Sequence, residues 1–88
     1  QDGIPVSIYP NPSSFEVTIE MDLDQFQGND VYYTLTDAAG KVVMSDYIIL
    51  ERGYNKHMLN VGSLSKGIYI LRFNQTKNYI TEARIVKK

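Results

Sequence analysis

The sequence contains no cysteine, no tryptophan and a single histidine. Without cysteine the chain can form no disulfide, offers no thiol nucleophile and provides no thiolate ligand for a metal ion. The histidine, His57, lies in the segment NKHMLN with no cysteine to pair with. We therefore expect a surface or packed imidazole at this position, and not a catalytic base or a metal ligand.

An excess of charge of either sign is also missing. The chain has nine basic and ten acidic residues, which give a formal net charge of −1. Proteins that bind nucleic acid usually carry a clear basic excess, so we expect no nucleic-acid partner. The longest apolar runs are far too short to span a membrane, which argues against stable membrane insertion.

The motifs of the common enzyme classes are absent as well. The nucleophile elbow G-x-S-x-G, the P-loop, the zinc motif H-E-x-x-H and the dinucleotide fingerprint do not occur. No histidine–acid pair is evident that could activate a serine. We therefore expect neither an enzyme nor a bound cofactor or metal ion.

What the sequence does contain is a strong alternation of apolar and polar residues. In FEVTIEMDLD the apolar side chains share one face, and VYYTLTD and GIYILRFN repeat the pattern. A period of two predicts half-buried strands, and no window has the spacing of a helix. The sequence predicts one all-β domain over residues 1–88, a small antiparallel immunoglobulin-like β-sandwich of about seven strands. The predicted strands lie near residues 4–9, 15–22, 31–37, 41–49, 56–60, 67–74 and 79–86.

Three breaks between the strands have a clear chemistry. In YPNPSS two prolines flank Asn11, and because proline fixes φ and restricts the residue before it, we expect a stiff corner. In TLTDAAGKVVM the side chain of Asp37 can bond the backbone two residues on, and Gly40 can adopt a positive φ. This predicts a hairpin with a loop of four or five residues. Gly67 is expected to ease the entry into the sixth strand.

Two groups of side chains are candidate binding residues on the strand faces. The acidic stripe of the second predicted strand consists of Glu16, Glu20, Asp22 and Asp24. It could bind Ca²⁺, but it lacks a calcium-binding loop and its side chains fan apart, so we interpret it as a solvated outer face. Tyr33 and Tyr69 fall on apolar faces and are predicted core residues. The tyrosines that the pattern leaves undecided are Tyr32, Tyr47, Tyr54 and Tyr79.

Four pieces of the sequence follow one another in a specific order: YPNP, DAAGK before VVM, LSKGIYILRF, and a closing IVKK. In order and spacing they closely resemble the type A C-terminal sorting domain of proteins exported by the type IX secretion system of Bacteroidetes bacteria, over about residues 4–88. A glycine that some members carry after the second proline is missing. The family pattern maps onto Tyr9, Pro10, Asn11 and Pro12, onto Asp37, Gly40 and Lys41, onto Leu64, Gly67 and Tyr69, and onto Lys87 and Lys88.

The resemblance implies an export label and not a catalyst. The cargo of such a label crosses the inner membrane, and the outer-membrane machinery recognises the label in the periplasm. A sortase-like peptidase then cuts just before the domain, here near or upstream of residues 1–4, and the cargo is often joined to anionic lipopolysaccharide at the cell surface or reaches the exterior. On this interpretation residues 1–3 are the remnant of a linker. The chain starts at Gln1 without a methionine or signal peptide, and we expect it to be a piece of a longer protein.

Several expectations about partners follow. The receptor is expected to read the corners and the last strand, which could pair with a sheet of the partner while Lys87 and Lys88 reach an acidic patch. An exposed edge strand would also allow two copies of the chain to pair as a homodimer. Two other functions remain open. One is a carbohydrate-binding module, which exposed coplanar aromatic rings would favour. The other is a structural immunoglobulin-like domain, which predicts further domains after Lys88.

Overall fold

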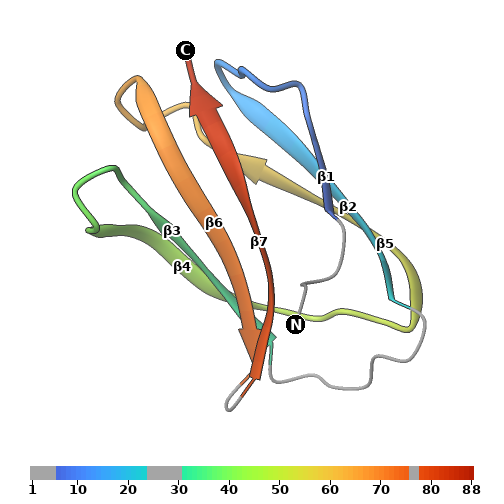
Figure 1. The fold of residues 1–88 in the computed structure, drawn as a ribbon. Coiled ribbons are helices and arrows are strands. Elements are labelled where there is room, and N and C mark those ends of the chain that lie inside the picture. The colour runs from blue at the N-terminus through green and yellow to red at the C-terminus, as the bar shows by residue number, and fades with distance from the viewer. Residues whose placement is uncertain (1–5, 24–30, 76–77) are drawn as a thin grey trace.

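The structure is a computed structural model, and it describes residues 6–23, 31–75 and 78–88. In these ranges the chain forms seven strands and no helix (Figure 1). None of the described segments is therefore a helix that could cross a membrane. The strands are β1 (Val6–Tyr9), β2 (Glu16–Leu23), β3 (Val31–Thr36), β4 (Val42–Ile48), β5 (Gly53–Asn60), β6 (Gly67–Gln75) and β7 (Asn78–Lys87).

The strands form two sheets that pack face to face. One sheet has the order β1-β2-β5 and the other the order β4-β3-β6-β7. All neighbours within a sheet are antiparallel. The chain passes from one sheet to the other after β2, after β4 and after β5. This arrangement confirms the predicted all-β sandwich of about seven antiparallel strands.

The fifth strand starts earlier than predicted. The turn-rich segment ERGYN suggested a break before residue 56, but β5 begins at Gly53, which lies opposite Leu23 of β2. Pairing with β2 decides the boundary, and tertiary context commonly overrides local propensity in this way. The turn residues hold the start of the strand, because Asn55 Nδ2 donates to the carbonyl oxygens of Glu51 at 2.7 Å and of Gly53 at 3.0 Å.

The core lies between the sheets and explains the alternation of the sequence. Successive side chains of a strand point to opposite faces, so every second residue enters the core. The side chains that are buried are Val17, Ile19, Met21, Val31, Tyr33, Leu35, Ile48, Leu50, Leu59, Val61, Tyr69, Leu71, Phe73 and Ile85. Burying one aliphatic or aromatic side chain of this kind contributes roughly 1.5–3 kcal/mol. Tyr33 and Tyr69 are thus confirmed as core residues.

Candidate functional site

The segments that carry the motif residues lie at one end of the sandwich. Strands β1, β3, β5 and β7 run toward this end, and β2, β4 and β6 start from it (Figure 1). We call it the motif end and define it as residues 10–15, 37–41, 61–66 and 87–88. It holds or directly adjoins eleven of the twelve motif residues, which are far apart in the sequence, and the twelfth, Tyr69, contacts it through a hydrogen bond to Ser65. The fold therefore brings together what the sequence presents as four separate pieces.

The corner after β1 is fastened to the last strand. Asn11 Nδ2 donates to the carbonyl oxygen of Arg84 at 2.9 Å, and the N–H of Val86 donates to Asn11 Oδ1 at 2.8 Å. The N–H of Ser13 donates to the carbonyl oxygen of Val86 at 2.9 Å, and the N–H of Lys88 donates to that of Ser13 at 2.8 Å. The peptide bonds before Pro10 and Pro12 are both cis. We call the four hydrogen bonds that join Asn11 and Ser13 to the end of the chain, at residues 84, 86 and 88, the clip.

The clip changes one expectation about the last strand. β7 is an edge strand, but the bonded carbonyl of Arg84, both backbone groups of Val86 and the N–H of Lys88 already have partners within the chain. This stretch is therefore not free to pair with a sheet of another protein while the clip is closed. Ser13, at the centre of the clip, is only 3% exposed, and its hydroxyl donates to the carbonyl oxygen of Glu16 at 2.8 Å.

The hairpin between β3 and β4 is built as its sequence predicts. Asp37 Oδ1 accepts the N–H of Ala39 at 3.0 Å and the N–H of Lys41 at 2.9 Å. The N–H of Gly40 donates to the carbonyl oxygen of Asp37 at 3.0 Å, and Gly40 has a φ of 89°. A side chain at position 40 would meet no atom within 4 Å, so the positive φ alone accounts for the glycine. Asp37 and Gly40 therefore shape the turn.

The loop before β6 is held in place by residues that pack in or against the core. Tyr69 is buried, and its hydroxyl donates to the carbonyl oxygen of Ser65 at 2.6 Å. Leu64 packs against the core, and its N–H donates to the carbonyl oxygen of Val61 at 3.1 Å. Gly67 has a φ of 152° and lies opposite Lys87 of β7. The loop is thus fixed beside the end of the last strand.

The hairpin and this loop enclose a shallow hollow of about 260 Å³, lined by residues 37–39 and 65–69. Its surroundings are basic. Five lysines lie in the described part of the chain, and four of them, Lys41, Lys66, Lys87 and Lys88, belong to the motif end. The motif end contains fewer carboxylates than lysines, and the carboxylate of Asp37 already accepts hydrogen bonds from two backbone N–H groups. The motif end can therefore attract an acidic surface although the whole chain has nearly no net charge.

A second cluster was not predicted from the sequence. On the outer face of the smaller sheet, the hydroxyls of Tyr9 and Tyr54 both donate to Glu20 Oε2, at 2.6 and 2.7 Å. These bonds lower the pKa of Glu20, and the hydrogen bond to the carboxylate raises the pKa of Tyr9 and raises that of Tyr54 to about 12. Glu20 thus lies on an exposed outer face, as predicted, but its hydrogen bonds to two tyrosines were not predicted. Only the pairing register places these side chains together, and sequence alone does not give it.

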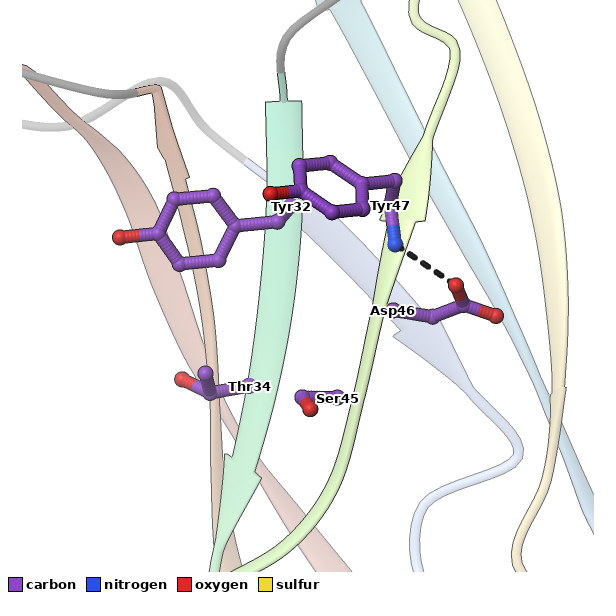
Figure 2. Close-up of a pocket in the computed structure, with 5 residues that line it drawn as sticks. All are labelled: Tyr32, Thr34, Ser45, Asp46 and Tyr47. Carbon is purple, nitrogen blue, oxygen red and sulfur yellow. Dashed lines mark hydrogen bonds between the residues drawn. The ribbon is translucent and has the colours of Figure 1, made fainter.

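The other candidate residues include two pairs of neighbouring rings. The ring of His57 lies beside that of Tyr33, with centroids 6.5 Å apart. Tyr32 and Tyr47 meet at an interplanar angle of 66°, so their rings are not coplanar (Figure 2). Asp24 and the side chain of Tyr79 lie outside the described residues. Within the described part, no three histidine, aspartate or glutamate side chains gather in a way that could hold a metal ion.

The comparisons with known proteins give one match. The family model described as "Secretion system C-terminal sorting domain" matches residues 7–88. The match includes the corner, the hairpin, the loop before β6 and the closing lysines, which are the segments that the fold collects at the motif end. No curated protein and no solved structure matches the chain significantly.

Proposed function

Because this chain belongs to the family of secretion system C-terminal sorting domains, the sorting signals of type IX secretion, we propose that the motif end is the surface that the export machinery binds. The domain on this proposal is a non-catalytic label that directs a cargo protein to the cell surface or the extracellular space. The observation that carries the proposal is spatial. Four segments spread from residue 9 to residue 88 form one continuous end of the sandwich.

The rigidity of this end supports a role in recognition. The clip, the Asp37 turn and the bond from Tyr69 to Ser65 fix the four segments before any partner arrives. A surface that is already ordered loses little conformational entropy on binding, so more of the contact energy appears as affinity. We therefore propose that the partner reads a preformed shape, and that Lys66, Lys87 and Lys88 face an acidic patch on it.

The later steps of export belong to the same proposal. Recognition takes place in the periplasm by outer-membrane components of the machinery. A sortase-like peptidase then separates the cargo from the label at a site upstream of residue 4, and the cargo is attached to anionic lipopolysaccharide. The domain holds no group in its described part that suggests it performs these reactions itself, so we assign them to its partners. The carbohydrate-binding alternative finds no support in Tyr32 and Tyr47, because their rings are not coplanar.

A paired substitution tests the proposal. Lys87 and Lys88 are replaced together by alanine, and Lys56, an exposed lysine on β5 away from the motif end, is replaced as the control. Export of a fused reporter and the thermal midpoint are measured for each variant. We expect export to fall about tenfold for the double variant, because its charge complementarity is lost, with an unchanged midpoint.

Two results would contradict the proposal. If the double variant exports its reporter as well as the Lys56→Ala control does, the closing lysines do not contribute to recognition. If its thermal midpoint falls together with export, the lysines act by supporting the fold, which contradicts their proposed role as a binding surface.

A further inference from the structure

Strand β6 departs from the alternation of polar and apolar residues that β2 follows. Its sequence begins GIYIL, and because Tyr69 and Leu71 are buried in the core, Ile68 and Ile70 lie on the outer face of the larger sheet. A strand with one face in water carries polar residues on that face, whereas a strand that is apolar on both faces is typically covered on both. Among the described strands β6 contacts only its sheet neighbours, β3 and β7. No described strand therefore covers its outer face.

Neighbouring strands extend these two isoleucines into a larger apolar surface. Ile68 lies opposite Val86 of β7, and Ile70 lies opposite Thr36 of β3, which in turn lies opposite Val42 of β4. The hydroxyl of Thr36 donates to the carbonyl oxygen of Ile70 at 3.3 Å, so its donor already has a partner. We call Val42, Ile68, Ile70 and Val86 the apolar patch.

The outer face of the smaller sheet is built differently. β2 places three carboxylates on it, those of Glu16, Glu20 and Asp22. The exposed apolar side chains of that face lie among these charges, and they are Tyr9, Tyr54 and Met58. On the larger sheet, the only carboxylate in the sequences of β6 and β7 belongs to Glu82, and it is paired with Arg72 at 2.9 Å. An exposed apolar patch that no charge interrupts marks the larger sheet as the face that a partner covers.

The groups around the apolar patch indicate the chemistry of that partner. Arg84 lies opposite Ile70 and shares its face. The patch also adjoins the motif end, because Lys41 directly precedes Val42 and Lys87 directly follows Val86. An apolar centre with a charged rim is the usual anatomy of a protein interface, and a basic rim is complementary to carboxylates.

The direction in which the patch faces favours a protein over a lipid surface. Side chains stand roughly perpendicular to a sheet, so the patch faces sideways, whereas the closing lysines lie at the end toward which β7 runs (Figure 1). A folded protein surface can cover the end and the adjoining face together. A flat bilayer cannot lie against both at once.

We propose that the apolar patch is a second part of the surface that the export machinery binds, and that its occupant is a protein surface whose apolar centre is bordered by carboxylates. The inference rests on the proposed function, because it extends the same contact from the motif end onto the larger sheet. The lysines then orient the partner as it approaches. The patch supplies the desolvated centre, where most of the binding energy of an interface is concentrated.

Replacing one isoleucine of the patch tests the inference. Ile68 is 47% exposed, and its matched control is Met58, which is 55% exposed on the outer face of the smaller sheet. Export of a fused reporter and the thermal midpoint are measured for Ile68→Ser and Met58→Ser. We expect export to fall about tenfold for Ile68→Ser and to stay within about twofold of the wild type for Met58→Ser, with similar midpoints for the two variants. Val42→Ser, across the patch, should lose export as Ile68→Ser does.

Two results would overturn the inference. One is export of Ile68→Ser and Val42→Ser at the level of the Met58→Ser control. The other is a thermal midpoint that falls for both patch variants and not for the control, since these residues would then act through the fold. The variants also separate this inference from the proposed function. If the patch variants export normally while the double replacement of Lys87 and Lys88 does not, only the patch is refuted, and normal export of all of them refutes both.

Cosedimentation with vesicles tests the lipid surface as an occupant. The 88-residue chain is mixed with vesicles of phosphatidylcholine and phosphatidylglycerol in equal parts, and we expect it to remain in the supernatant. A wild-type chain that sediments with the vesicles, and that does so less after Ile68→Ser, would assign the apolar patch to a membrane and overturn the protein occupant.

Discussion

At the scale of the single residue, the carboxylate of Glu20 joins three strands. Glu20 lies on the central strand β2, and it accepts hydrogen bonds from Tyr9 of β1 at 2.6 Å and from Tyr54 of β5 at 2.7 Å. Hydrogen bonds to an ionised acceptor are shorter and stronger than those between neutral groups. Because Tyr9 is directly followed by Pro10, this carboxylate also orients the start of the corner.

The protonation of this cluster gives a pH dependence with a defined sign. The two hydroxyl donors lower the pKa of Glu20 from 4.5, so its stabilising contribution is complete above pH 4.5 and is lost as the pH falls through the lowered value. The carboxylate raises the pKa of Tyr54 from 10.0 to about 12, so that contribution is complete below pH 10.0 and is lost as the pH rises toward 12. Chemical denaturation as a function of pH measures both limits.

Substitution of Glu20 tests whether its carboxylate is what raises the pKa of Tyr54. In Glu20→Gln the pKa of Tyr54 should fall back toward 10.0, because a neutral amide no longer favours the protonated phenol. Asp22→Asn, two residues along the same strand face, is the matched control and should leave Tyr54 as it is. A titration of the tyrosine ring signals by NMR distinguishes the variants, and an unchanged Tyr54 in Glu20→Gln would show that the bond does not control its titration.

At the scale of the element, the clip is the contact that joins the first part of the chain to the last strand. The side-chain amide of Asn11 contributes both of its polar atoms, Nδ2 as donor to the carbonyl oxygen of Arg84 and Oδ1 as acceptor from the N–H of Val86. A single asparagine side chain thereby imitates one residue of a neighbouring strand. Ser13 continues the pattern through its backbone and forms an isolated parallel bridge with Lys87. The corner therefore behaves as a short extra strand at the edge of the larger sheet.

Asn11→Ala should weaken this junction measurably. Each of its two hydrogen bonds contributes about 0.5–1.5 kcal/mol, so we expect the free energy of unfolding to fall by about 1–2 kcal/mol. Asn11→Asp keeps the acceptor but loses the donor and should have an intermediate effect. Urea denaturation gives the stabilities, and hydrogen exchange at the N–H of Val86 reports the local opening. Unchanged exchange at Val86 in Asn11→Ala would contradict the proposed role of the side chain.

The elements could be predicted from the sequence to different degrees. In β2, β3 and β6 every second side chain is apolar and enters the core, and the bounds of these strands were predicted to within one residue. The turn at Asp37 was predictable because its hydrogen bonds join residues that are close in sequence. The clip could not be predicted, since its side-chain bonds join residues 73 and 75 positions apart. The Glu20 cluster could not be predicted either, because it depends on which residues of three strands lie side by side.

At the scale of the whole molecule, one core supports both sheets and all four segments of the motif end. Val17 and Ile19 come from one sheet, and Leu35, Leu71 and Ile85 from the other, and all are at most 1% exposed. A domain of this size has a total stability of only roughly 4–13 kcal/mol. The surface at the motif end therefore exists only while the common core is intact.

A core truncation should show this dependence. We expect Leu71→Ala to reduce the free energy of unfolding by about 2–5 kcal/mol, because it leaves a cavity at a fully buried site of the inner strand β6. Ile68→Ala, on the same strand but 47% exposed, should cost less than about 1 kcal/mol. Urea denaturation followed by tyrosine fluorescence measures both. Equal losses for the two variants would show that the interior at Leu71 is not tightly packed.

The clip also has a kinetic consequence. Its hydrogen bonds close a loop that contains almost the entire polypeptide. Closing such a long loop in the unfolded chain loses conformational entropy before the hydrogen bonds contribute any stabilising free energy. We therefore expect these bonds to form among the last events of folding, after the hairpins have zipped. By the same reasoning they are the first to open in the native protein. Such a local opening would briefly expose the C-terminal end of β7 while the rest of the sandwich stays folded.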